Sequence, residues 1–119
     1  MTDAALFEAR ADGIAIITLN RPEARNAVNG DVANGLEAAL DRYEADPDLW
    51  AAILTANGTA FCAGADLKEI AAGRAHLLTT AKGGFAGLVS RARTKPLIAA
   101  IAGSALAGGT RIRAEIPIR

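Results

Sequence analysis

Two loops of small residues in this sequence could present backbone N–H groups to a ligand. They span residues 61–69 and residues 103–109, and each follows an apolar run that is typical of a buried strand. The pattern predicts that each loop opens a helix, whose dipole would place positive charge behind the loop's N–H groups. If the two loops converge on one point, they form an oxyanion hole, which stabilises developing negative charge without a charged side chain.

Three other features could bind phosphate or react, but the residues next to them in the sequence do not favour such roles. Residues 103–110 nearly match a phosphate-binding P-loop, but Gly109 stands where that loop needs a lysine. Cys62 has no histidine near it in the sequence, which favours a small buried side chain over a nucleophile. His76, the only histidine, is expected at the surface or at the start of a helix.

Three polar residues lie where the helix after the first loop is predicted to begin. Asp66, with Glu69 three residues later, is typical of a helix N-cap. We therefore expect Asp66 to cap this helix, and a catalytic acid is the alternative. Lys68 and Glu69 are most simply part of a solvated helix face.

The composition excludes several classes of protein. The chain has 119 residues, enough for one domain. Its 13 basic and 13 acidic side chains cancel, which leaves no overall field to attract nucleic acid or an anionic membrane. With a single cysteine, Cys62, neither an internal disulfide nor a cysteine metal cluster can form, and no metal site is predicted.

The sequence also bears on where the protein works. Its first residues lack the basic start and the apolar run of a signal peptide. No apolar segment approaches the roughly 18 residues needed to cross a bilayer. We therefore expect a soluble, cytoplasmic α/β protein with no membrane partner.

The elements that would position the two loops alternate between strand and helix. Apolar runs predict strands at residues 14–19, 51–55 and 97–102, the first of them in a hairpin that turns at Asp12-Gly13. Between the first two, apolar side chains recur with helical spacing and predict a helix over about residues 30–45. The apolar positions of that helix are Val32, Leu36, Ala39, Leu40 and Tyr43.

Two further helices are predicted, a short one from Asp66 and a longer one over residues 77–93, which three glycines weaken. Tyr43 and Trp50 are expected to pack in the core beneath the sheet. The order strand, helix, strand, helix, strand is typical of a parallel sheet with right-handed crossovers.

Four short motifs give the sequence a family resemblance. They are Leu19-Asn20-Arg21-Pro22, Asn26-Ala27, residues 61–67 and residues 95–109. In order, spacing and intervening strand–helix pattern they resemble the crotonase family, the superfamily of enoyl-CoA hydratases and isomerases. The resemblance implies a spiral of repeated ββα units, truncated here after the third parallel strand. Residues 1–110 would be the N-terminal portion of such a domain, and residues 111–119 a divergent tail.

The resemblance also implies a site for acyl-coenzyme A thioesters. Carried over residue by residue, the two backbone N–H donors to the thioester oxygen fall on Ala65 and Gly108. Coenzyme A, as part of the substrate and not as a separate cofactor, would lie along residues 20–26 and against the first loop. The substrate-binding residues so implied are Arg25, near a phosphate, and Ala63, Gly64, Asp66, Leu67 and Lys68.

The physical chemistry of the two donor positions agrees with this assignment. Ala65 precedes one predicted helix and Gly108 the other, and N–H groups at a helix start have no acceptor within the helix. Glycine at position 108 would let a ligand approach the backbone closely. Both residues could instead be plain small residues that suit tight strand-to-helix turns.

The sequence departs from the family where its two catalytic glutamates are expected. Arg111 occupies the position of the first glutamate, and the second would fall after Arg119. Residues 111–119 alternate between apolar and polar side chains like a strand, and the resemblance stops after Gly109 or Thr110. Since the resemblance implies a chain about twice this length, we expect a truncated, frameshifted or spliced product. The resemblance implies a homotrimer or hexamer for intact members of the family, an assembly that we do not carry over to this chain.

The function implied is hydration of a 2-enoyl-CoA through its thioester enolate, in fatty-acid metabolism. Isomerisation or another enolate reaction is the alternative within the family, because the carboxylates that would decide between them are missing. Arg111 favours an alternative of another class, a catalytically inactive module that binds acyl-CoA or a partner protein. A fragment without function is the third possibility.

Overall fold

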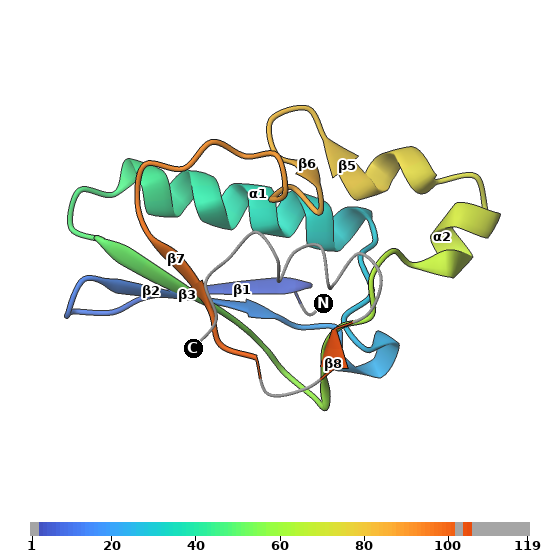
Figure 1. The fold of residues 1–119 in the computed structure, drawn as a ribbon, viewed down its shortest axis with the longest axis horizontal. Coiled ribbons are helices and arrows are strands. Elements are labelled where there is room, and N and C mark those ends of the chain that lie inside the picture. Colours follow the sequence, from blue (N-terminus) through green and yellow to red (C-terminus); the bar gives the residue numbers. More distant parts are fainter. Residues whose placement is uncertain (1–2, 102–103, 106–119) are drawn as a thin grey trace.

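A four-stranded sheet with one long helix along it forms the body of the protein (Figure 1). The computed structural model describes residues 3–101 and 104–105. The strands are β1 (Ala5–Ala9), β2 (Ile14–Leu19), β3 (Ala51–Ala56), β4 (Ala60–Cys62), β5 (Thr79–Thr80), β6 (Gly84–Phe85), β7 (Leu97–Ala99) and β8 (Ser104–Ala105). The helices are α1 (Gly30–Ala45) and α2 (Leu67–Ala71), with the 3-10 turns η1 (Pro22–Ala24) and η2 (Ala75–Leu78).

The order of the main sheet is β1-β2-β3-β7. β1 and β2 form the predicted antiparallel hairpin, in which Ala5 pairs with Leu19 and Gly13 turns the chain with a φ of 86°. β2, β3 and β7 run parallel to one another. The three predicted strands are therefore confirmed in one sheet, although β7 ends at Ala99 and is shorter than expected.

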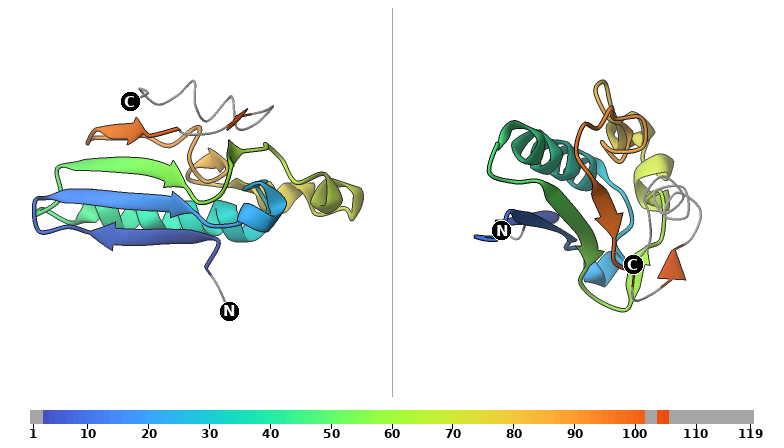
Figure 2. Two further views of the ribbon diagram at one scale, coloured as in Figure 1. Left: turned by 90° about the horizontal axis from the view of Figure 1, so that it is seen from below. Right: turned by 60° about the vertical axis from the view of Figure 1, so that its left-hand side comes forward.

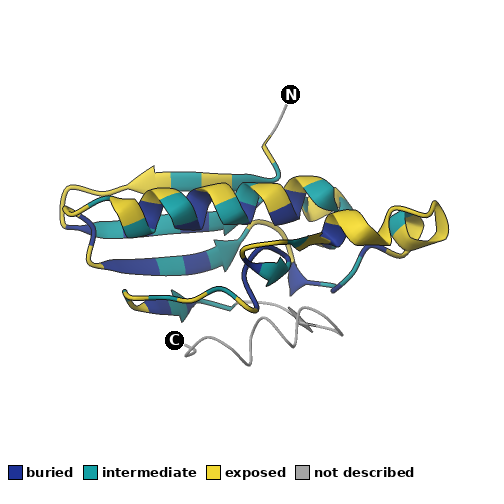
Figure 3. Ribbon diagram, turned by 90° about the horizontal axis from the view of Figure 1, so that it is seen from above, coloured by how far each residue is buried: buried dark blue, intermediate teal, exposed yellow. Residues whose placement is uncertain are grey.

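Helix α1 lies along one face of this sheet (Figure 2) and has the bounds that the helical spacing predicted. Asn29 caps its first turn, because the side chain accepts a hydrogen bond from the Val32 N–H at 2.9 Å. Figure 3 shows the buried residues of α1 on one side of the helix. All five apolar positions predicted for it are buried: Val32, Leu36, Ala39, Leu40 and Tyr43.

Of the two aromatic residues expected in the core, only Tyr43 is there. Its side chain is fully buried, and its hydroxyl donates to the Pro96 carbonyl across 2.5 Å. The prediction for Trp50 is wrong, because 63% of this residue is exposed. Trp50 lies against the hairpin turn at Gly13, where its Nε1–H donates to the Asp12 carbonyl at 3.1 Å.

The long helix predicted over residues 77–93 is also wrong. The chain there forms η2, the two short strands β5 and β6, and a series of turns. Gly84, Ala86 and Gly87 have φ angles of 71°, 59° and 68°, a left-handed conformation that a right-handed helix cannot contain. At Gly87 the backbone lies so close to α1 that a Cβ atom would approach the Ala33 carbonyl oxygen to 2.3 Å. This part of the chain therefore packs closely against α1 at Gly87 and does not form the predicted helix.

A second, smaller ladder stands beside the main sheet. β4 and β8 pair in parallel, with Ala60 opposite Ser104 and Cys62 opposite Ala105. Among the described residues no helix is long and apolar enough to cross a membrane, and no group of three or more His, Cys, Asp or Glu could hold a metal ion. The division between residues 1–110 and residues 111–119 stays a prediction, since residues 106–119 lie outside the described part.

Candidate oxyanion site

The first predicted loop leads from β4 to α2 and lies alongside residues 25–28. Ala65 forms an isolated parallel bridge with Val28. The Val28 N–H donates to the Gly64 carbonyl at 2.7 Å, and the Asp66 N–H donates to the Val28 carbonyl at 2.9 Å. Two hydrogen bonds to one residue therefore fix the backbone on either side of Ala65.

This bridge leaves the Ala65 N–H pointing away from Val28. A parallel bridge uses the carbonyl before the paired residue and the N–H after it, while the residue's own N–H faces the opposite side. Within the described part of the chain, no acceptor contacts the Ala65 N–H. The half-buried Ala65 can thus offer a backbone donor to a ligand.

Asp66 is the N-cap of α2, as predicted. Its Oδ1 atom accepts from the Lys68 N–H at 2.9 Å, and its Oδ2 atom accepts from Arg21 Nη1 at 3.1 Å. Burial alone would raise the pKa of this carboxyl, but the hydrogen bonds from Arg21 and from the backbone at Lys68 and Glu69 outweigh it and lower the pKa. A carboxylate that is ionised and that caps a helix has a structural role, because a catalytic acid must carry a proton to donate.

The dipole behind this loop is weak, because the helix that begins after Asp66 is short, as predicted. α2 has only five residues, and the positive charge at a helix start comes from aligned peptides over the helix. Leu67 and Lys68 in its first turn are exposed, and 76% of Leu67 is accessible. The solvated face expected at Lys68 is confirmed, while Glu69 is half-buried and pairs with the Arg74 guanidinium.

The structure brings Arg25 next to the same loop. The Arg25 carbonyl accepts a hydrogen bond from the Ala63 N–H at 3.0 Å. Arg25 is exposed, with a left-handed φ of 53° at the end of η1. Of the residues predicted to bind substrate, Ala63 and Gly64 have N–H groups that already bond within the protein, to Arg25 and to the Cys62 sulfur.

The second predicted donor, Gly108, lies outside the described residues. The strand that precedes it, β8, is parallel to β4, with Ala105 opposite Cys62. Ala65 and Gly108 each follow one of these paired residues by three positions. Since the carboxyl ends of parallel strands meet at one edge, this register supports convergence of the two loops.

The other reactive side chains have the plain roles expected of them. Cys62 is fully buried; its thiol donates to the Asn26 carbonyl at 3.2 Å and accepts from the Gly64 N–H at 3.4 Å. Burial raises the pKa of this thiol, which keeps it protonated and a poor nucleophile. His76 is exposed in η2.

Sequence reasoning missed the importance of Asn26. This residue is fully buried, and its carboxamide bonds to three backbone groups, the Arg21 N–H and the carbonyls of Asn57 and Ala60. Its φ of 57° is left-handed, a conformation that Asn tolerates better than most residues. The available signal was the Asn26-Ala27 motif, which contributed to the family resemblance but was given no structural role.

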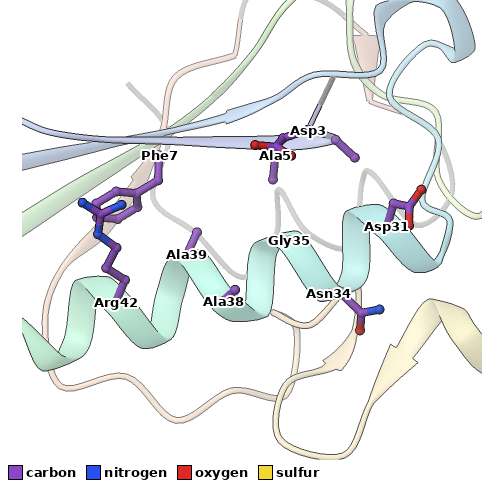
Figure 4. A pocket seen from close by; sticks show the side chains of 10 residues that line it. Asp3, Ala5, Phe7, Asp31, Asn34, Gly35, Ala38, Ala39 and Arg42 are labelled. Atoms are coloured by element: carbon purple, nitrogen blue, oxygen red, sulfur yellow. The ribbon is translucent and has the colours of Figure 1, made fainter. Parts of the chain in front are cut away.

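A groove lies elsewhere, between β1 and α1 (Figure 4). Small residues of α1, Gly35, Ala38 and Ala39, form one wall. Arg42 stands at one end, with its guanidinium 4.4 Å from the centre of the Phe7 ring. No residue predicted to bind substrate lines this groove, so it is separate from the candidate oxyanion site.

Comparison with known proteins points to one family. The family described as enoyl-CoA hydratase/isomerase matches residues 9–114. The enoyl-CoA hydratase EchA19 of Mycobacterium tuberculosis is 43% identical over 122 residues, which cover 97% of this chain and 45% of that protein. The mevalonyl-coenzyme A hydratase SIDH of Beauveria bassiana is 44% identical over 106 residues, or 81% of this chain and 38% of that protein.

Solved structures agree with the sequence matches. An enoyl-CoA hydratase from Mycobacterium tuberculosis H37Rv has a TM-score of 0.89 and 46% identity, over 98% of this chain and 45% of that one. A carnitinyl-CoA hydratase from Mycobacterium avium has a TM-score of 0.85 and 42% identity. This chain therefore spans less than half the length of the relatives that it matches.

Proposed function

This chain belongs to the enoyl-CoA hydratase/isomerase family, the crotonase superfamily, and from that premise we propose that it holds the thioester oxygen of an acyl-CoA substrate. The Ala65 N–H is one donor to this oxygen and the Gly108 N–H is the other. The observation that carries the proposal is the Ala65 N–H itself, which the bridge to Val28 turns away from every described acceptor.

The two donors would act on the charge that develops during reaction. When a nucleophile adds to the β-carbon of a 2-enoyl thioester, electron density moves through the conjugated system onto the thioester oxygen. Backbone N–H groups fixed in advance stabilise this enolate without reorganising, and removing one such donor typically costs about 10²–10³ in kcat. Hydration of a 2-enoyl-CoA is the reaction that we propose for the whole protein, with isomerisation as the alternative.

The names of the similar proteins support hydration over a non-catalytic binding module. EchA19 is named an enoyl-CoA hydratase, and SIDH is named a mevalonyl-coenzyme A hydratase. Coenzyme A would then be part of the substrate, lying along Arg25 and the exposed Leu67 and Lys68, with no separate cofactor. Asp66 would hold α2 in place beside it.

We also propose a place in the cytoplasm and, for the whole protein but not for residues 1–119 alone, a homotrimer or hexamer. Fatty-acid metabolism is the corresponding context.

The experiment compares two ligands that differ at one carbon atom, which is a carbonyl in the first and a methylene in the second. Crotonyl-CoA has the thioester carbonyl, and its but-2-enyl thioether analogue lacks it. Calorimetric titration of this chain should give tighter binding of the thioester. Ala65→Pro and Gly108→Pro each delete one N–H and should abolish the preference, whereas Ala65→Gly keeps the N–H and should retain it. Equal affinity of the unchanged protein for both ligands would refute the proposed function.

A further inference from the structure

We propose that Asn26 is a positioning residue for the Ala65 N–H, an inference that rests on the proposed role of this N–H as a thioester donor. Asn26 does not belong to the loop that carries the donor. It lies in the neighbouring segment of residues 25–28, and it acts on Ala65 through the hydrogen bonds between these two segments.

The first step is the way in which the Asn26 side chain is held. Its Oδ1 atom accepts from the Arg21 N–H at 2.7 Å, and its Nδ2 atom donates to the carbonyls of Asn57 and Ala60, each at 2.9 Å. Asn26 is fully buried. Its carboxamide therefore connects three parts of the chain: Arg21 just before η1, the turn after β3, and the first residue of β4.

The second step is the backbone of the same segment. Arg25 and Asn26 are consecutive left-handed residues, with φ angles of 53° and 57°. Such a pair is unfavourable for residues with side chains and persists only where the surroundings over-determine it. The Asn26 N–H also donates to the Arg21 carbonyl at 2.8 Å. The double left-handed turn sets the course of residues 25–28 beside the donor loop.

The third step is the contact between the two segments. The Ala63 N–H bonds to the Arg25 carbonyl at 3.0 Å, and the Asp66 N–H bonds to the Val28 carbonyl at 2.9 Å. The Gly64 N–H bonds to the Cys62 sulfur, whose thiol in turn donates to the Asn26 carbonyl. Within the described chain, the Ala65 N–H is thus the one donor of residues 63–66 that is left for a ligand.

Asn26 therefore connects the hydrogen bonds that hold the Ala65 N–H in place. Its side chain fixes residues 25–28 to the start of β4 at Ala60, and the backbone of the same segment fixes the chain after β4 up to Asp66. A shift of residues 25–28 would therefore turn the Ala65 N–H.

The test uses two variants at position 26. Asn26→Gly keeps the left-handed φ at little cost and removes the carboxamide. Asn26→Asp keeps the shape but places a carboxylate oxygen against the carbonyls of Asn57 and Ala60. Cys62→Ala cuts only the link from the Asn26 carbonyl to the Gly64 N–H, and it decides the question if both variants at position 26 fail to fold.

Two controls separate positioning from general loss of stability. Tyr43→Phe removes the buried hydrogen bond to Pro96, away from the donor loop, and lowers the melting temperature. Asn34→Asp makes the same chemical change as Asn26→Asp on the exposed face of α1.

The readouts are the Ala65 amide resonance in ¹⁵N-labelled protein and the affinity ratio between crotonyl-CoA and its but-2-enyl thioether. The variants at position 26 should shift the resonance and lower the ratio about fivefold, the effect of losing roughly one hydrogen bond. Cys62→Ala should change both readouts in the same direction by less, and both controls should leave them unchanged.

The inference would be overturned if the variants at position 26 melted at a lower temperature but kept the Ala65 resonance and the affinity ratio. If those variants did not fold, a Cys62→Ala protein with the same Ala65 resonance and affinity ratio as the unsubstituted protein would overturn it. If the unchanged protein did not prefer the thioester, the proposed function would fail. The Ala65 resonance would then still decide whether Asn26 sets the geometry of this N–H.

Discussion

The guanidinium of Arg21 meets the carboxylate of Asp66 at 3.1 Å, although the two residues are 45 positions apart in the sequence. The same Nη1 atom donates to the Ala27 carbonyl at 2.6 Å. The ion pair is largely buried, with 20% of the Arg21 side chain and 11% of the Asp66 side chain exposed. It therefore joins the cap of α2 to the segment that bridges Ala65.

Asp66→Asn should lower the free energy of unfolding by about 1 kcal/mol at pH 7. Asparagine caps a helix about as well as aspartate, so the loss reports the ion pair. Because the fold lowers the pKa of Asp66, its contribution is complete above the unfolded pKa of about 3.9 and is lost as the pH falls through the lower, folded value. Urea unfolding at pH 7 and at pH 3 should therefore show a smaller difference from the unchanged protein at pH 3.

Asp12→Asn is the matched control for this experiment. Asp12 pairs with Arg10 at 3.0 Å, but about half of each side chain is exposed. Solvent screens such a pair, so its loss should cost well under about 1 kcal/mol. An equal loss for Asp66→Asn at both pH values would contradict the role of the Asp66 charge.

Lys95→Met should destabilise the protein by about 2 kcal/mol. The Lys95 ammonium donates to three carbonyls where α1 ends: Tyr43 at 3.0 Å, Asp46 at 2.6 Å and Leu49 at 2.7 Å. A cation at this end of a helix also opposes the negative end of the dipole. Methionine preserves much of the length of the side chain and removes all three bonds, which urea unfolding would measure.

Lys82→Met provides the comparison. Lys82 bonds to Asp41 at 3.0 Å, but 60% of its side chain is exposed. The change should cost less than about 1 kcal/mol. Similar losses for the two lysine variants would mean that the three carbonyls find water as easily as they find Lys95.

Gly87→Ala should destabilise the protein more than Gly73→Ala. Both glycines have a left-handed φ, of 68° and 80°, so both substitutions add backbone strain of about 1 kcal/mol. At Gly87 the new Cβ would also approach the Ala33 carbonyl oxygen to 2.3 Å, whereas nothing lies within 4 Å of it at Gly73. Thermal unfolding of the two variants would measure the difference, and equal losses would contradict the close packing of this segment on α1.

The same glycine shows where sequence reasoning reached its limit. The spacing of Val32, Leu36 and Leu40 predicted α1 correctly, because this helix buries one continuous stripe against the sheet. Residues 77–93 contain a similar share of apolar residues, but their course depends on the close approach of Gly87 to α1, which no local pattern encodes. The parallel α/β fold was predicted from the order of strands and helices, and its crotonase type from the four motifs; both are confirmed.

The candidate site divides in the same way. The loop and the cap at Asp66 followed from residue types and spacing. The roles of Arg21 and Asn26 depend on contacts with residues more than 30 positions away, and the sequence alone did not predict them. Convergence of Gly108 on the donor at Ala65 stays a prediction.

Residues 1–119 by themselves should bind crotonyl-CoA but hydrate it slowly or not at all. The family resemblance places the first catalytic glutamate at position 111, where this chain has Arg111. General acid–base groups typically contribute about 10²–10⁴-fold each, and this chain matches only 45% of the length of EchA19. Arg111→Glu alone should therefore not restore turnover, because the second glutamate and the rest of the enclosing site would still be absent.

The decline in ultraviolet absorbance of the enoyl thioester would measure the rate, with a full-length hydratase as the positive control. A rate of about 10 s⁻¹, typical of enzymes, would contradict the prediction and assign the chemistry to Glu69, to Glu115 or to a partner subunit.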